Sequence, residues 1–414
     1  MKLKLLLISF LFQLGFAQHR TCGMQEQLQQ VMNNPEKKQE YIQRHAKLEV
    51  ALQKLSTNRG VNNVIVIPVA VHFPAAGGAN SAVKTCLRSL AQTQINILNA
   101  DYNAQNSEIS NWTNDAPYYP MVTSVGNLNV QFVLATQNHP AGTGLAEGAV
   151  AVTFGTDFLS DTATDVTWAG YLNFVIRILP KGQLGFTANL GCSPAKGDCV
   201  TITTTAFGSG VGCTGFVPKS PFDLGRSLTH ELGHYFSLEH PFAGGCNATN
   251  CSTMGDMICD TPAIANPSYD CPATGSVVGC VNGEYALTMN YMDYANDACM
   301  YMFTKEQETK MRAWYTIVAS EFKTNVLANE QFLQNNFSVY PNPSKGSFTI
   351  EFKELTDSYS VEVFDLTGKT IYENNYAQSS DLMQEINLKN ILNGVYFMNI
   401  KSDKGITTKK LIVQ

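Results

Sequence analysis

The chain has 414 residues, of which 15% are charged and 44% are hydrophobic, and its formal net charge is −6. This length predicts two to three domains. The acidic balance, without a basic patch, argues against a nucleic-acid-binding protein. After the N-terminal leader no apolar run reaches the roughly 18 residues that a transmembrane helix needs, so none is predicted.

Residues 1–17 are predicted to be a signal peptide. Two lysines precede an apolar stretch, which ends in Phe16-Ala17-Gln18 with a small residue before the expected cleavage. A buried N-terminal helix is the alternative. Export implies an oxidising compartment, where most cysteines are paired. The chain has 11 cysteines, an odd number, so at least one is expected to be free.

Cys22 lies near the expected mature N-terminus, far from the main cysteine cluster. Because a thiolate is a good zinc ligand, Cys22 is predicted to close a zinc site in a latent precursor. An unpaired or intermolecularly paired thiol is the alternative. Residues 25–56 are predicted to be helical. The polar break Asn58-Arg59-Gly60 is a plausible cleavage site, so residues 18–58 are predicted to be a latency prosegment and residues 59–328 a separate domain.

Strand and helix patterns follow one another in the next part of the chain. His72 lies in the first strand, which is dense in β-branched residues, and is interpreted as structural. The mixture predicts an α+β domain. The predicted elements are a helix at Ala82–Leu98, strands at Val64–Phe73, Leu128–Leu134, Tyr171–Leu179 and Asp198–Thr205, and an edge strand with its loop at Gly182–Phe186.

A further helix is predicted to begin near Phe222, with Asp223 as its N-cap. It would place His230 and His234, four residues apart, on one face, where both can bind one zinc ion. Glu231 lies next to the first ligand, where it can reach a water bound to the metal. These features predict a zinc site on the helix.

His240 follows six residues after His234 and must return on a loop to supply a third nitrogen. The fourth position then stays open, as in catalytic zinc sites. The stretch resembles HExxHxxGxxH, the extended motif of the metzincins, with Ser237 in place of Gly. A non-Gly residue in the left-handed conformation costs on the order of 1–2 kcal/mol, which a folded, metal-bound domain tolerates. A surface helix that carries histidines by chance is the alternative.

The segment after the histidines is long and irregular, and it contains five cysteines. Asp256 and Asp260 offer hard oxygen ligands that suit a structural calcium ion, although solvated loop carboxylates explain them equally well. Met292, within the sequence NYMDY, resembles the Met-turn of the metzincins, which forms an apolar floor under the zinc. Tyr294, by the same resemblance, is predicted to stabilise the oxyanion as it forms.

Three blocks narrow the resemblance to the pappalysin family of metzincins. They are LGRSLTHELGH, the GD…DTPA loop and NYMDYANDACMYMFTKEQETKMR, and the RTCGM element adds the prosegment. The resemblance covers roughly Asn58 to Val326. It implies an α+β metzincin catalytic domain with a mixed sheet, a zinc-binding helix and a Met-turn, which makes residues 59–328 a zinc metallopeptidase domain.

The same resemblance implies a Cys271–Cys299 disulfide and structural calcium near the two loop aspartates. It also implies a second bridge, from Cys280 to one of the cysteines after the third histidine, such as Cys251. Family members that cut at Arg place an acidic residue just before the cysteine that matches Cys299. Here Ala298 stands at that position and Asp297 comes one step earlier, so the cleavage preference stays open.

A closing helix is predicted at residues 305–325 and a linker at residues 329–336. About seven short alternating strands separated by turn signals then predict a small all-β sandwich over residues 337–414. VYPNPSKGSFTIEF, VFDLTGKTIYE, LNGVYFMNI and KKLIVQ resemble the C-terminal sorting domain of the type IX secretion system. The resemblance implies export through the periplasm and outer membrane, with the type IX machinery as a partner. A carbohydrate- or surface-binding module is the alternative.

Together these features predict a secreted zinc endopeptidase that is made as a latent precursor. It would hydrolyse peptide bonds in proteins with a zinc-activated water and Glu231 as the general base. Three alternatives remain: a catalytically silent metzincin-fold binding protein, an adhesin that acts through its β tail, and a zinc amidase that acts on a non-protein substrate.

Overall fold

The computed structural model describes most of the chain. The predicted signal peptide, the polar break at residues 58–60 and the predicted linker lie outside the described residues. Those residues are 19–57, 64–122, 124–159, 163–180, 182–247, 250–327, 337–352, 358–365, 369–376, 382–388, 391–402 and 405–414.

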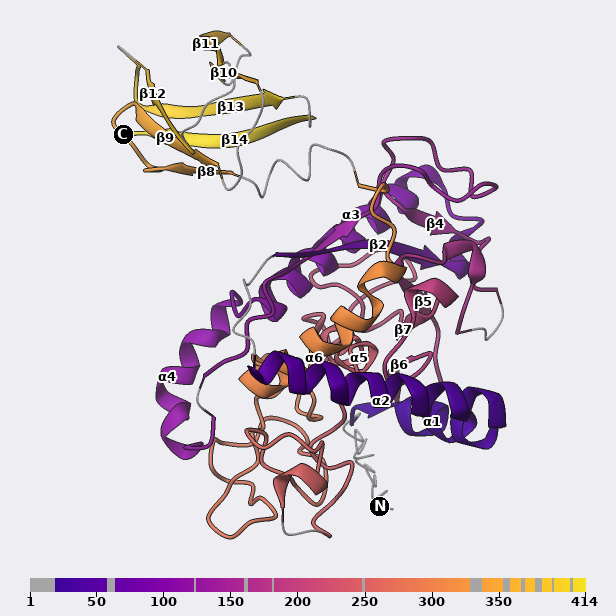
Figure 1. Cartoon of the computed structure of the whole chain (residues 1–414). Coiled ribbons are helices and arrows are strands. Elements are labelled where there is room, and N and C mark those ends of the chain that lie inside the picture. Colours follow the sequence, from indigo (N-terminus) through magenta and orange to yellow (C-terminus); the bar gives the residue numbers. More distant parts are fainter. Residues whose placement is uncertain are drawn as a thin grey trace, which may run out of the picture.

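A mixed seven-stranded sheet forms the centre of the larger part of the molecule (Figure 1). Its strand order is β1-β6-β7-β5-β2-β3, and β4 also pairs with β2. The β6–β7 pair is antiparallel, whereas the other pairs are parallel. The strands are β1 (Thr21–Cys22), β2 (Ile65–Phe73), β3 (Val130–Leu134), β4 (Val152–Phe154), β5 (Leu172–Arg177), β6 (Gln183–Thr187) and β7 (Cys199–Thr203).

Helices pack around this sheet. Helix α5 packs against β6 and β7, and α2 packs against α6. Strand β2 is buried at eight of its nine positions, as expected for a parallel strand with both faces covered. The helices are α1 (Met24–Asn33), α2 (Pro35–Thr57), α3 (Ser81–Tyr102), α4 (Trp112–Asp115), α5 (Arg226–Tyr235) and α6 (Lys305–Val318).

The structure corrects three predicted helix boundaries. The helix expected at residues 25–56 is two helices, because Pro35 keeps the preceding Asn34 in an extended conformation, with φ −100° and ψ 116°. The helix expected to begin near Phe222 with Asp223 as its cap begins later, after Gly225 with φ 77°. The helix expected at residues 305–325 ends at Val318.

The predicted edge strand is also different in the structure. Residues Thr21 and Cys22 pair with β6 in parallel, so β6 lies inside the sheet while the N-terminal segment is present. The backbone N–H of Gly23 extends this pairing by donating to the carbonyl of Gly185 over 2.9 Å. The first strand of the sheet therefore comes from the predicted prosegment.

His72 is fully buried in β2 and has polar neighbours on both sides of its ring. Its Nδ1 lies 2.8 Å from Thr153 Oγ1, and its Nε2 lies 3.2 Å from Asn173 Oδ1. These contacts satisfy the buried imidazole within the sheet. They agree with its interpretation as a structural residue.

Four disulfides connect eight of the 11 cysteines. Cys271 pairs with Cys299, the bridge that the family resemblance implies. Cys280 pairs with Cys246, not with Cys251. The remaining bridges are Cys251–Cys259 and Cys86–Cys213, and the free cysteines are Cys22, Cys192 and Cys199, all buried.

The C-terminal part is a β-sandwich with a core of its own. One sheet has the order β11-β10-β13-β14 and the other the order β12-β9-β8, and they enclose Phe348, Ile350, Val361 and Leu411 among other buried side chains. The strands are β8 (Phe337–Tyr340), β9 (Ser347–Phe352), β10 (Tyr359–Asp365), β11 (Thr370–Tyr376), β12 (Met383–Asn387), β13 (Gly394–Ser402) and β14 (Gly405–Val413).

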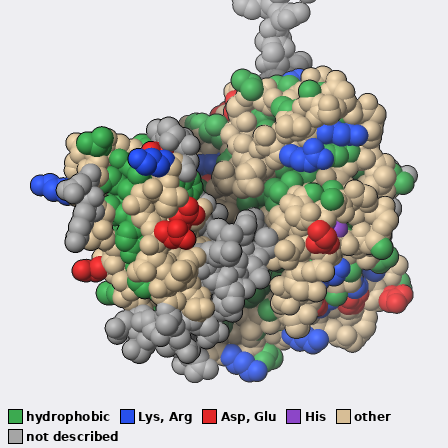
Figure 2. Space-filling view, turned by 90° about the horizontal axis from the view of Figure 1, so that it is seen from above, with side chains coloured by type: hydrophobic (Ala, Val, Ile, Leu, Met, Phe, Trp, Pro, Cys, Tyr) green, Lys and Arg blue, Asp and Glu red, His purple; other side chains and the backbone are tan. Residues whose placement is uncertain are grey.

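Lys and Arg side chains lie in separate small groups on the face displayed in Figure 2, between polar and hydrophobic side chains. Within the part of the chain that the structure describes, no helix combines the length and apolar character needed to cross a bilayer.

Candidate metal centre

Helix α5 presents two buried histidines on one face. His230 Nδ1 donates to the carbonyl of Tyr291 over 2.7 Å, and His234 Nδ1 donates to the carbonyl of Leu238 over 2.6 Å. A carbonyl can only accept, so the protons must sit on the two Nδ1 atoms. The Nε2 atoms are then left with free lone pairs, which is the form that binds a metal.

Ser237 forms the turn that returns the chain to this face. Its φ is 70°, so the serine adopts the left-handed conformation that a glycine has in the motif it resembles. The N–H of Ser237 donates to the carbonyl of His234 over 2.9 Å, and that of Leu238 to Gly233 over 3.0 Å. The helix thus ends in a hydrogen-bonded turn, and His240 reaches the other two histidines.

Three imidazole nitrogens converge, and those of His230 and His234 carry no proton. His240 Nε2 lies 3.1 Å from His230 Nε2 and 3.0 Å from His234 Nε2. Tetrahedral zinc with Zn–N bonds of about 2.0–2.1 Å separates its ligand nitrogens by roughly 3.3 Å. One ligand atom from each histidine and from Cys22 all lie within 4.8 Å of one another. The side chains therefore fit a zinc ion.

The electrostatics of the histidines favour the neutral, metal-binding form. Burial lowers the pKa of His234 to about 4. Burial, followed by the charge on the neighbouring histidines, holds the pKa values of His230 and His240 well below their ordinary value. All three rings are therefore neutral near pH 7, as a zinc ligand must be.

Glu231 lies beside the histidines and is 2% exposed. Burial raises the pKa of Glu231 to about 8 while Cys22 is in place. The thiol of Cys22 donates to Glu231 Oε2 over 3.2 Å. Strand β6 passes close by, since a Cβ added at Gly185 would lie 2.6 Å from Glu231 Cγ. Gly185 is a contact that sequence reasoning did not find.

Met292 and Tyr294 come from the predicted Met-turn. A Cβ added at Gly233 would lie 2.4 Å from Met292 Sδ, so the fully buried methionine packs directly against the helix that carries the histidines. The Tyr294 ring centroid lies 5.1 Å from that of His240, and its hydroxyl accepts the N–H of Cys22 over 3.2 Å. Both residues are thus beside the centre.

Arg20 is a second residue of the N-terminal segment in this region. Its side chain is buried, and its Nη2 donates to Asp297 Oδ1 over 2.6 Å. Asp297 Oδ2 accepts the N–H groups of Leu224 and Arg226 over 3.0 and 3.2 Å. Sequence reasoning singled out Asp297 but missed Arg20. A lone arginine two residues before Cys22 was the available signal.

The two loop aspartates, Asp256 and Asp260, are both buried. Asp256 Oδ1 accepts the N–H of Ile258 over 3.1 Å, and Asp260 Oδ2 accepts that of Glu306 over 2.9 Å. Among the described residues, the second carboxylate oxygen of each has no hydrogen-bond partner. Buried carboxylate oxygens without partners are costly, which is consistent with a cation in this loop.

Two regions of the chain match protein family models. Residues 219–316 match a peptidase family described as pregnancy-associated plasma protein-A. Residues 338–414 match the secretion system C-terminal sorting domain. The first match contains all three converging histidines, and the second contains nearly all of the β-sandwich.

Several curated relatives are extracellular metalloproteases of fungi. That of Pyricularia oryzae is 28% identical over 291 residues, which is 68% of this chain and 87% of the relative. Extracellular metalloprotease 1 of Coccidioides posadasii is 39% identical over 166 residues, which is 36% of this chain and 57% of the relative. The chain spans 33–57% of the length of four of the curated relatives that it matches.

A solved structure extends the similarity over more of the chain. A promirolysin variant from Tannerella forsythia is 27% identical, with a TM-score of 0.52, over 72% of this chain and 94% of that one.

Proposed function

We propose that the chain is a secreted zinc endopeptidase made as a latent precursor, because it matches the pregnancy-associated plasma protein-A peptidase family over residues 219–316 and the secretion system C-terminal sorting domain over residues 338–414. The observation that carries the proposal is the convergence of three buried histidine Nε2 atoms beside Glu231. A structural zinc site has no use for a carboxylate at that position, which disfavours a catalytically silent binding protein.

His230, His234 and His240 would hold the zinc ion. When bound, zinc activates a water molecule and polarises the scissile carbonyl. Glu231 is the group that takes a proton from the attacking water and delivers it to the leaving amine. Its burial and its contact with Cys22 support this role, since the same carboxylate oxygen becomes free when the thiol leaves.

Tyr294 would stabilise the negative charge that develops on the substrate. Its hydroxyl oxygen accepts the N–H of Cys22 in the precursor. Once the N-terminal segment leaves, a substrate can take the place of Cys22, and the hydroxyl can donate its proton to the developing oxyanion. The ring is fixed beside His240 and Phe242, whose centroids lie 5.1 and 4.9 Å away.

Latency is assigned to residues 18–58, with Cys22 as the group that closes the centre. In the precursor Cys22 would be the fourth zinc ligand, as a thiolate. Strand β1 supports this assignment, because its pairing with β6 holds Cys22 against Glu231. The peptidase domain is assigned to residues 59–328.

The substrate preference is proposed to be for peptides with a basic side chain next to the scissile bond. The support is the buried Arg20–Asp297 ion pair, since Arg20 lies only two residues from Cys22. Asp297 would take the guanidinium of a substrate when Arg20 leaves. A planar guanidinium suits a carboxylate at this distance.

Export is assigned to residues 337–414, with the type IX secretion machinery as the partner. The matched sorting domain and the independent core of the sandwich support this assignment. An adhesin that acts through these residues is the runner-up, and surface binding by the chain with and without them distinguishes the two.

Removing the metal is expected to stop hydrolysis. The processed protein should bind about one zinc ion per chain and cleave casein, and a chelator should abolish the cleavage until zinc is restored. Zinc content and casein hydrolysis are measured on the same sample. A protein that retains its zinc and cleaves no protein substrate would contradict the proposal and leave the fold unaffected.

Calcium is expected to stabilise the loop that carries Asp256 and Asp260. A ligand present at 100 times its dissociation constant adds about 2.7 kcal/mol to the free energy of unfolding, so calcium should raise the melting temperature. Asp256→Asn should remove most of that increase, whereas Asp270→Asn, at an exposed loop position, should keep it. Equal increases in both variants would place the calcium elsewhere.

A further inference from the structure

The N-terminal segment, residues 19–57, contacts the rest of the molecule from its first residues to its second helix. Arg20 and Cys22 are buried beside Asp297 and Glu231, α1 contacts β6, and α2 packs against α6. We propose that these residues form a separable inhibitor, which stays bound to the enzyme through α2 after the chain is cut between α2 and β2. The proposal concerns how the proposed active site is regulated. Only the inhibitory effect of the segment rests on the proposed function.

An apolar contact fixes the middle of α2. Leu48 is 1% exposed and belongs to the main hydrophobic core, and Ala51, Leu52 and Leu55 pack against the same core. The core against which α2 packs includes Trp314 of α6, which is fully buried. Loss of α2 would expose this surface to water, which disfavours dissociation.

Polar contacts set the position of α2 along this surface. His45 Nε2 donates to the carbonyl of Leu190 over 3.3 Å, and its ring centroid lies 5.7 Å from that of Trp314. Arg44 pairs with Glu321 over 3.4 Å. Glu40 makes an ion pair with Lys196, the last residue of the short 3-10 helix Pro194–Lys196. Glu40, Arg44 and His45 do not themselves contact the three histidines, whereas Tyr41 on the same helix packs against the cluster that contains Cys22 and Tyr294.

Binding of α2 strengthens the binding of the first residues of the segment. While α2 is bound, Arg20 and Cys22 remain close to Asp297 and Glu231, so their rebinding is an intramolecular event at a high effective concentration. A cut between α2 and β2 removes the covalent link but neither contact. The cut precursor should therefore stay inhibited until the whole segment dissociates.

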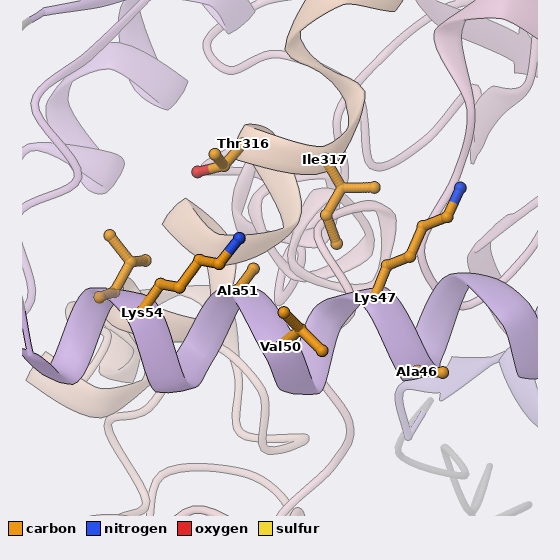
Figure 3. Close-up of a pocket in the computed structure, with 8 residues that line it drawn as sticks. Ala46, Lys47, Val50, Ala51, Lys54, Thr316 and Ile317 are labelled. Carbon is orange, nitrogen blue, oxygen red and sulfur yellow. The ribbon is translucent and has the colours of Figure 1, made fainter.

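A groove of about 620 Å³ lies where the C-terminal half of α2 meets α6 (Figure 3). Its lining comes from both helices, namely Ala46, Lys47, Val50, Ala51, Lys54, Leu55, Thr316 and Ile317. Ala51 and Leu55 also pack against the main core, so this half of α2 contributes to the apolar contact.

The test uses the full chain with residues 58–63 replaced by the recognition site of an unrelated protease. After cutting, retention of the 19–57 fragment is measured by size-exclusion chromatography and mass spectrometry, and casein hydrolysis is followed after dilution. The wild-type fragment should co-elute with the enzyme, and hydrolysis should rise slowly as the fragment leaves. Retention needs no activity, so its result stands even if no sample hydrolyses casein.

Three variants separate the contact of α2 from that of the first residues. Leu48→Ala should release the fragment at least ten-fold faster, whereas Ile42→Ala, at a position 49% exposed on the same helix, should not. Cys22→Ser should keep the fragment bound. If the uncut Leu48→Ala protein has a much lower melting temperature than the wild type, His45→Ala is used in its place. Immediate loss of the wild-type fragment, or equal release from the Leu48 and Ile42 variants, overturns the proposal.

Discussion

Replacing Glu231 with Ala is expected to abolish peptide hydrolysis and leave the zinc content unchanged. Glu231 provides no ligand atom to the group formed by the three histidines and Cys22, so its removal spares the metal site. General acid–base groups contribute about 10²–10⁴-fold to the rate, and the value of kcat/KM should fall by at least that much. Zinc content and casein hydrolysis are measured on processed wild type and variant.

A matched variant distinguishes lost chemistry from lost structure. Glu231→Gln keeps the size and burial of the side chain but cannot act as a base, so it should be nearly as inactive as Glu231→Ala. The melting temperature should change little in either variant. An Ala variant that keeps a tenth of the wild-type activity with full zinc would show that another group accepts the proton.

Asp297→Ala is expected to have the second largest effect on kcat/KM. This effect should depend on the substrate. Truncating one partner of a buried, hydrogen-bonded charge pair costs about 2–5 kcal/mol, which corresponds to roughly a 30-fold or larger loss. The value of kcat/KM for an arginine peptide should fall by this factor, whereas that for a peptide with an apolar residue should fall much less. Both are measured with fluorogenic peptides that differ at one position.

Asp297→Asn separates the two roles of this side chain. The amide oxygen can still accept the N–H groups of Leu224 and Arg226, whereas the charge that attracts a guanidinium is lost. The Asn variant should therefore keep the melting temperature of the processed enzyme and lose the arginine preference. If kcat/KM falls equally for the arginine peptide and the apolar peptide in both variants, Asp297 supports the fold and does not select the substrate.

The convergence of the histidines could be predicted from the sequence because two of them are close together in the chain. His230 and His234 lie four residues apart on one helix, so a regular backbone alone brings them together. Ser237 left the position of His240 uncertain, since a non-Gly residue rarely adopts a positive φ. The structure gives Ser237 a φ of 70°, and the hydrogen bonds of the turn stabilise it there.

The start of α5 could not be predicted, because the residue that caps it is distant in sequence. Local capping rules favoured Asp223, a side chain adjacent to the helix. In the structure Asp297, 71 residues after Arg226, accepts the first N–H groups instead, and Gly225 makes the turn with φ 77°. The prediction that Cys280 pairs with a cysteine after the third histidine is confirmed, but the example Cys251 was wrong, since spacing alone does not distinguish Cys246 from Cys251.

Strand β6 was predicted as an edge, and on the proposed activation it would become one when the N-terminal segment leaves. The carbonyl of Gly185, which accepts the N–H of Gly23, would then be unpaired beside Glu231. An extended peptide can add to such an edge through its backbone alone, whatever its sequence. If the proposed function holds, the edge would select substrates by conformation: a helix or compact turn cannot make these hydrogen bonds, so folded proteins would have to open locally before they are cut.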